Sequence, residues 1–136
     1  MKDTLISFET AKLAKEKGFN IECGNYYRVW YKEAQLHLGS MYSNDLKEDN
    51  PPNEYFYLAP TLSLAQKWLR EVYNIHIVIS VDFYKDGINY LWQVFKYDVT
   101  KKYNCEGTGV YGDNGEYPIY EQCLEAAIQE SLKLIK

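Results

Sequence analysis

The feature that most constrains the fold is an amphipathic helical segment that runs almost directly into an alternating strand segment. Residues 61–73 carry apolar side chains at helical spacing, with a stripe of Leu62, Ala65, Leu69 and Val72 that is widened by Leu64 and Trp68. After one intervening residue the chain alternates, which places one set of side chains on a single sheet face: Ile75, Ile77, Ile79, Val81 and Phe83. This succession predicts a helix that packs on the strand that follows it.

The strand is predicted to form a hairpin that a second helix follows. Lys-Asp-Gly at 85–87 is a turn signal, and residues 89–98 are the predicted return strand. Residues 120–135 again show helical spacing, with a predicted buried stripe of Tyr120, Leu124, Ala127, Ile128, Ser131 and Ile135. Cys123 lies beside this stripe and is interpreted as a small core residue.

The N-terminal half predicts one further helix and three extended segments. Ser7 is the expected N-cap of the first helix, and Gly18 followed by Phe19 is a typical helix stop. Strands are expected at 26–31, 35–38 and 54–58. Segments 39–53 and 100–117 are polar and predict long loops, of which the first is expected to be the most mobile.

These elements predict a single α+β domain over residues 1–136. A chain of this length can bury a hydrophobic core without disulfides or metals. We expect a two-layer fold in which an antiparallel sheet of three to five strands carries three helices mainly on one face. The predicted order is helix, two strands, a short third strand, helix, two strands, helix.

The charge balance disfavours binding to duplex DNA. The chain has 15 basic and 19 acidic residues and a net charge of −4, whereas neutralising DNA phosphates requires clustered Lys and Arg. A local basic patch stays open, because net charge is a sum over the whole chain.

Cysteine usage and hydropathy predict a cytoplasmic protein without a membrane segment. The three cysteines, at 23, 105 and 123, are odd in number and have no short paired spacing, which argues against a disulfide framework and a structural zinc site. The first residues lack the apolar stretch of a signal peptide, and no apolar run is long enough to span a bilayer.

No segment of the sequence predicts a catalytic, metal or cofactor site. Residues 107–112 match G-x-G-x-x-G, but no strand leads directly into them and no helix follows directly, so they are interpreted as a loop. His76 and Asp82 share a strand face but lie about 20 Å apart, too far to bind one ion. A thiol nucleophile at Cys23 or Cys105 needs a base that only the fold can supply.

Aromatic residues are the one functional candidate. The chain has 14 Tyr, 3 Trp and 5 Phe, and tyrosine suits half-exposed strands and interfaces. The candidate interaction surface consists of Tyr84, Tyr90, Trp92 and Tyr97 on the hairpin, or Tyr27 and Trp30 on the first strand. These rings can stack bases of a single strand or anchor a protein partner. The alternative is that the helices cover them as part of the core.

Three segments resemble a known group of proteins. They are ISFETAKLAKEKGF at 6–19, APTLSLAQKWLREVYNIHI at 59–77 and YEQCLEAAIQESLKLI at 120–135. In this order they resemble small uncharacterised proteins of Bacteroides-type gut bacteria and their phages and prophages. This chain departs from the group by having Cys123 and Ser131 where alanine is typical. The resemblance implies a mobile-element context and an accessory role, and it transfers no catalytic residue.

The leading functional hypothesis is a non-enzymatic accessory protein that acts by protein–protein interaction. Its expected partner is a host or phage protein, or a second copy of the chain as a homodimer, and no cofactor is expected. The first alternative is a single-stranded nucleic-acid binder that uses the aromatic hairpin. The second is a small hydrolase or transferase that uses Cys105 or Cys23.

Overall fold

The computed structural model describes residues 3–30, 33–38, 56–96, 110–112 and 117–136. They belong to two compact units, residues 1–63 and residues 64–136, and each unit is described here by itself. The chain length predicts a single domain. The assembly of the two units into one domain stays a prediction.

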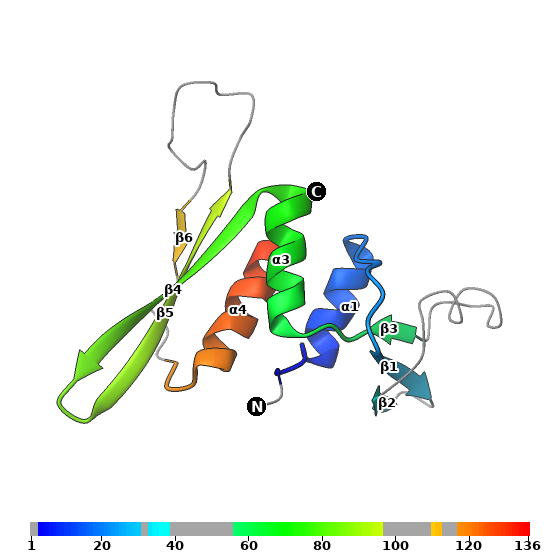
Figure 1. The fold of residues 1–136 in the computed structure, drawn as a ribbon, viewed down its shortest axis with the longest axis horizontal. Coiled ribbons are helices and arrows are strands. Elements are labelled where there is room, and N and C mark those ends of the chain that lie inside the picture. The colour runs from blue at the N-terminus through cyan, green and yellow to red at the C-terminus, as the bar shows by residue number, and fades with distance from the viewer. Residues whose placement is uncertain (1–2, 31–32, 39–55, 97–109, 113–116) are drawn as a thin grey trace, which may run out of the picture. The chain divides into compact units, whose positions relative to one another are not determined.

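The elements confirm an α+β protein and follow the predicted order except for one additional short strand, β6, between the hairpin and the last helix (Figure 1). In chain order they are α1 (Phe8–Glu16), β1 (Asn25–Trp30), β2 (Glu33–Leu38), β3 (Phe56–Leu58), α3 (Leu62–Tyr73), β4 (Ile75–Tyr84), β5 (Gly87–Lys96), β6 (Val110–Gly112) and α4 (Tyr120–Lys133).

The strands form two antiparallel sheets, which corrects the prediction of one sheet. The first has the order β2-β1-β3 and the second the order β4-β5-β6. Two features explain the separation. Pro60 lies two residues after the end of β3 and has no amide to donate to a ladder, and the chain then enters α3 before it reaches β4. The first sheet therefore ends at β3, and β4 begins a new sheet.

Local capping explains the limits of α1. The Ser7 hydroxyl accepts a hydrogen bond from the Thr10 amide at 3.3 Å, as expected of an N-cap. At the other end Gly18 has φ 89°, and the Phe19 amide donates to the Ala14 carbonyl at 2.9 Å. This is the bond of a Schellman motif, in which glycine avoids the steric cost of the left-handed conformation. Both predicted limits are confirmed.

Aromatic contacts attach α1 to the first sheet. Phe8 makes edge-to-face contacts with Tyr27 and Tyr57, with ring centroids 5.6 and 5.3 Å apart. The Tyr27 hydroxyl donates to the Ile6 carbonyl at 2.8 Å. Lys15 donates to the Phe56 carbonyl at 2.8 Å, and its ammonium group lies 4.7 Å from the centre of the Tyr57 ring. Aromatic residues of β1 and β3 thus serve the packing of this unit.

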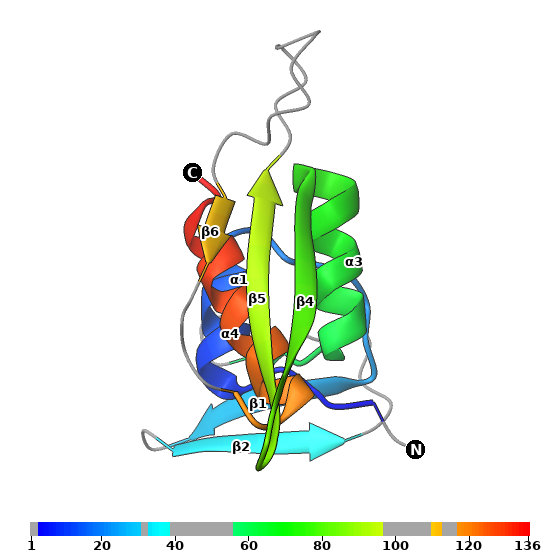
Figure 2. The same ribbon diagram turned by 90° about the vertical axis from the view of Figure 1, so that its left-hand side faces the viewer.

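The second unit consists of α3, the β4–β5 hairpin, β6 and α4. Figure 2 shows α3 alongside the upper part of β4 and β6 alongside the upper part of β5. The buried residues of the unit come from all three of its main elements: Leu69 and Trp68 of α3, Ile75 and Val94 of the hairpin, and Leu124, Ala127, Ile128 and Leu132 of α4. Two residues of the predicted helix stripes are exposed instead, Val72 and Tyr120, because each lies in a terminal turn of its helix.

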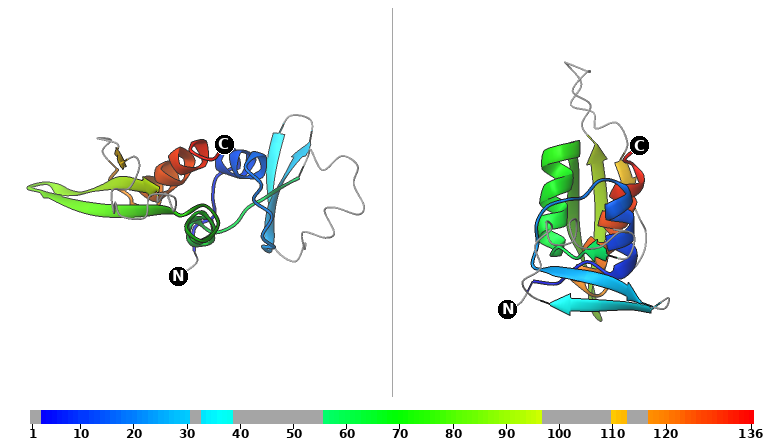
Figure 3. Two further views of the ribbon diagram at one scale, coloured as in Figure 1. Left: turned by 90° about the horizontal axis from the view of Figure 1, so that it is seen from above. Right: turned by 90° about the vertical axis from the view of Figure 1, so that its right-hand side faces the viewer.

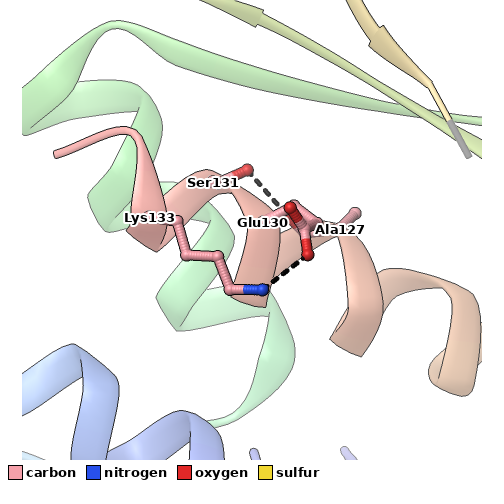
Figure 4. Close-up of polar contacts among 4 residues, drawn as sticks. All are labelled: Ala127, Glu130, Ser131 and Lys133. Carbon is pink, nitrogen blue, oxygen red and sulfur yellow. Dashed lines mark hydrogen bonds and ion pairs between the residues drawn. The ribbon is translucent and has the colours of Figure 1, made fainter.

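Figure 4 shows how α4 accommodates a buried hydroxyl. Ser131 is fully buried, and its hydroxyl donates to the Ala127 carbonyl of the preceding turn at 2.7 Å. The buried oxygen is therefore satisfied within the helix. On the exposed side Lys133 contacts Glu130 at 2.7 Å, an i,i+3 ion pair on the helix surface. Cys123 is fully buried, which confirms it as a core residue.

Two long loops were predicted, and the structure describes part of one of them. Segment 39–53 lies outside the described residues. Segment 100–117 contains the short strand β6, which pairs with β5 from Gln93↔Gly112 to Phe95↔Val110. The glycine motif at 107–112 therefore overlaps a strand at its C-terminal end, which corrects its interpretation as a loop throughout.

Candidate interaction surface

The β4–β5 hairpin has one apolar face that runs from its base to its tip. The two strands pair without a bulge from Ile75↔Lys96 to Tyr84↔Gly87. Directly opposed residues of an antiparallel pair point to the same side of the sheet. The apolar face, from base to tip, therefore carries Ile75, Ile77, Val94, Ile79, Trp92, Val81, Tyr90, Phe83 and Ile88.

The base half of this face is covered. Ile75 and Val94 are fully buried, and Trp92 and Ile77 nearly so, with α4 packed against both strands. The coverage has a geometric limit. The 14 residues of α4 rise about 21 Å, whereas a strand of ten residues extends about 33 Å. One helix of this length leaves the last third of the hairpin without cover.

The tip half of the same face is exposed. Val81 is 42% exposed, Ile88 45% and Phe83 79%, although all three continue the row of buried residues. Tyr84 is exposed on the opposite side of the tip. We call these four residues the hairpin tip. Figures 1 and 3 show the hairpin continuing past the end of α4. The sequence places Val81 and Phe83 on the face on which a helix is predicted to pack, but both are exposed because α4 is too short to reach them.

The outer edge of β4 offers backbone groups for further pairing. Within the described residues β4 has β5 as its one neighbour, so it is an edge strand of its sheet. In an antiparallel ladder every second residue turns its amide and carbonyl away from the partner strand. The Ile77 carbonyl accepts a bond from the Gln66 side chain of α3, so the odd-numbered residues of β4 face outward.

A second contact confirms this alternation. The Tyr90 amide on β5 donates to the Tyr117 carbonyl at 2.8 Å on the other side of the hairpin. Tyr90 is opposite Val81, so both residues belong to a pair that does not exchange bonds across β4 and β5. Among the residues that the structure describes, nothing pairs with the outward groups of Ile79, Val81 and Phe83. We call these outward groups the open edge.

The predicted aromatic residues of the hairpin take different positions. Tyr84 is exposed at the tip. Tyr90 is half-buried and meets Tyr120 edge to face at 5.5 Å between ring centroids. Trp92 is 5% exposed, and its indole N–H has no hydrogen-bond partner within the described part of the chain. Tyr97 lies outside the described residues.

The two predicted residues of β1 belong to the other unit. Tyr27 is half-buried and is held by its bond to Ile6 and its contact with Phe8. Trp30 is the last residue of β1, and its side chain is outside the description. Of the four candidate rings whose side chains the structure describes, Tyr84 alone lies on the exposed hairpin tip.

Sequence reasoning missed the aliphatic part of the tip and the open edge. Val81 and Phe83 follow an alternating pattern that predicts burial, and Ile88 precedes the predicted return strand at 89–98. A usable signal was the length of the strands, because two ten-residue strands extend farther than a helix of 14 residues.

The described cysteines do not form an activated nucleophile. Burial raises the pKa of the Cys23 thiol, and this effect outweighs the opposing hydrogen bonds with the backbone of Asn25 and Ala59. A reactive cysteine requires the opposite shift, since the thiolate is the nucleophile. Cys123 is fully buried, and Cys105 lies outside the described residues.

The described residues lack a metal-ligand cluster and a membrane-spanning helix. Within those ranges, no three His, Cys, Asp or Glu side chains come together as ligands for a metal ion. Among the helices described, none combines the length and the apolar character needed to cross a membrane.

Three comparisons of the chain with known proteins gave the same result. No protein-family model, curated protein or solved structure matches the chain.

Proposed function

We propose that this protein is a non-enzymatic interaction protein that binds a protein partner by adding a strand to the open edge of β4. The observation that carries the proposal is the coincidence of two features in one short segment. Val81 and Phe83 have outward backbone groups and exposed apolar side chains. A strand that pairs there gains main-chain hydrogen bonds and covers apolar surface at the same time.

The composition of β4 supports this role. Natural edge strands are commonly protected by lysine, proline or a bulge, which prevents unwanted pairing. Residues 75–84 contain no lysine or proline, and the ladder with β5 has no bulge. The one Asp, Glu, Lys or Arg of this strand, Asp82, turns its backbone groups toward β5, so the edge has little protection, as expected where pairing is the function.

The cellular context of the proposal is that of a phage or prophage accessory protein in the cytoplasm of a Bacteroides-type bacterium. It rests on the resemblance of segments 6–19, 59–77 and 120–135. Binding of single-stranded nucleic acid has weaker support from the geometry, because Trp92 is buried and Tyr90 packs against Tyr120. Neither ring is free to stack on a base in this arrangement.

A capture experiment with two matched variants tests the proposal. Immobilised full-length protein is exposed to Bacteroides lysate with nuclease, and bound proteins are quantified by mass spectrometry. Val81→Lys places a charge on the open edge and should reduce capture of a specific partner at least tenfold. Gln93→Lys, at an exposed position of β5, should leave it unchanged. Capture of the same proteins by both variants, or no captured protein from a chain that is also monomeric in solution, would contradict the proposal.

A further inference from the structure

We infer that the strand added to the open edge is β4 of a second copy of this chain, paired antiparallel about a two-fold axis at Val81. This inference rests on the proposed function and names the partner of the same edge. The pairing would join two three-stranded sheets into one continuous sheet. The inference has two grounds. The free backbone groups of the open edge extend equally far on both sides of Val81, and the side chains on one side of Val81 complement those on the other.

The backbone limits of the open edge are equidistant from Val81. On the base side, the Ile77 carbonyl is already bound to Gln66. On the tip side, the strand ends at the turn that begins with Lys85. Each limit lies four residues from Val81. An antiparallel two-fold pairing about Val81 therefore places residues 79–83 of one copy opposite residues 79–83 of the other. It does not use the Ile77 carbonyl, which is already bound.

In this register, the residues that lie opposite each other are those whose outward amide and carbonyl groups can form hydrogen bonds. Ile79 lies opposite Phe83 of the second copy, Val81 opposite its own counterpart, and Phe83 opposite Ile79 of the second copy. All three residues turn their amide and carbonyl outward, so each opposed pair exchanges two hydrogen bonds.

The side chains are also self-complementary in this register. On the apolar face Phe83, the most exposed residue of the tip, meets Ile79 of the second copy, and the two Val81 side chains meet at the axis. On the other face Val78 meets Tyr84, and Ser80 meets the Asp82 carboxylate, which can accept a bond from its hydroxyl. No like charges lie opposite each other.

The neighbouring two-fold registers lack this match. A pairing centred on Asp82 places the two Asp82 carboxylates directly opposite, which is destabilising. A pairing centred on Ser80 places Phe83 of the second copy opposite Ile77, whose carbonyl is held by Gln66. The register about Val81 is therefore favoured, and it closes the assembly at two copies because each chain has one open edge on β4.

Register-specific cross-linking of the full chain tests the inference. In a pair that exchanges two hydrogen bonds the Cα atoms are about 5.5 Å apart, which suits a disulfide. Val81→Cys should thus form a covalent dimer under mild oxidation. Ile79→Cys or Phe83→Cys alone should not, since equivalent positions lie about 13 Å apart. A mixture of the last two variants should cross-link again. The wild type under the same oxidation controls for the native cysteines.

Mass in solution provides the second readout. The wild type should sediment at twice the 16.0 kDa mass of one chain at high concentration. Val81→Lys should weaken dimerisation at least tenfold, because two lysines then face each other at the axis. Gln93→Lys is the control, since Gln93 is exposed on β5 and lies outside both the hairpin tip and the open edge, and it should leave the dimer intact.

The outcomes separate this inference from the proposed function. A monomeric mass at all concentrations, or cross-linking of Ile79→Cys alone but not of Val81→Cys, overturns the second copy in this register. If Val81→Lys still abolishes capture of another protein in that case, the proposed function stands with a different strand as partner. If capture is also insensitive to Val81→Lys, both fail. Efficient cross-linking at Val81 together with the dimer mass supports the inference.

Discussion

The side chain of Gln66 on α3 donates a hydrogen bond to the backbone carbonyl of Ile77 on β4, with 3.3 Å between Nε2 and the oxygen. The two residues are 11 positions apart and are joined by the short connection at Asn74, which has φ 55°. This bond occupies the base of an edge strand whose continuation from Ile79 to Phe83 is open. Because the bond from α3 occupies the Ile77 carbonyl, a further strand can pair with β4 only beyond this residue, toward the hairpin tip.

Gln66→Ala should destabilise the fold modestly. It leaves the Ile77 carbonyl without its partner, and the net contribution of such a hydrogen bond is about 1 kcal/mol. Equilibrium unfolding in urea measures the change. Lys67→Ala is the control on the same helix, since its 3.9 Å contact with Glu71 is exposed and should contribute less than about 0.5 kcal/mol. A larger loss for Lys67→Ala would refute the assigned role of Gln66.

A charge introduced at a buried position of α3 or β4 should prevent folding, whereas removal of a charge near the hairpin tip should not. Ile77→Asp and Leu69→Asp each place a carboxylate at a buried position, which costs several kcal/mol. Asp82→Ala alters an exposed side chain and should change stability by less than about 0.5 kcal/mol. Thermal unfolding followed by circular dichroism compares the three. Equal melting temperatures would contradict the strand assignment.

Two aromatic residues of the same hairpin face should respond differently to truncation. Trp92→Ala removes a ring that is 5% exposed and should cost about 3–5 kcal/mol. Phe83→Ala removes a ring that is 79% exposed, so the stability of the isolated chain should fall by less than about 1 kcal/mol. Urea unfolding at low protein concentration separates the two. Similar costs would show that the tip is covered within one chain.

Cys23 should react slowly with alkylating reagents at neutral pH. Burial raises the pKa of its thiol, which keeps the thiolate fraction below that of an exposed cysteine. Because the folded-state pKa is the higher one, the thiol contributes stability at neutral pH that is lost as pH rises into the alkaline range. Alkylation rates for Cys23, measured by peptide mass spectrometry, should increase with pH. A rate at pH 7 above that of a free cysteine would contradict the direction of the shift.

Local patterns predicted the elements well. The Ser7 cap and the Gly18–Phe19 stop limited α1 correctly, because both depend on bonds between residues close in sequence. Helical spacing located α3 and α4, and the alternation from Ile75 located β4. The return strand begins at Gly87 rather than at residue 89, because the turn places Gly87 opposite Tyr84.

The sequence predicted long-range properties less well than local ones. Alternation states which side chains share a face but not how far a helix covers it, so Phe83 was expected to be buried and is exposed. Composition identifies tyrosines but not their contacts, and Tyr27 and Tyr90 turn out to pack against neighbouring rings. Edge position depends on strand order, which a single sequence does not encode locally, and the open edge was therefore not predicted.

The central claim is that the open edge of β4 pairs with β4 of a second copy of the chain. Residue-resolved amide hydrogen exchange of the full chain, measured across a range of protein concentrations, tests it most directly. At low concentration the amides of Ser80 and Asp82, which face β5, should be protected, while those of Ile79, Val81 and Phe83 should exchange rapidly. At high concentration the three outward amides should gain protection together. Outward amides that exchange rapidly at every concentration, or that are protected even at the lowest, would contradict the account.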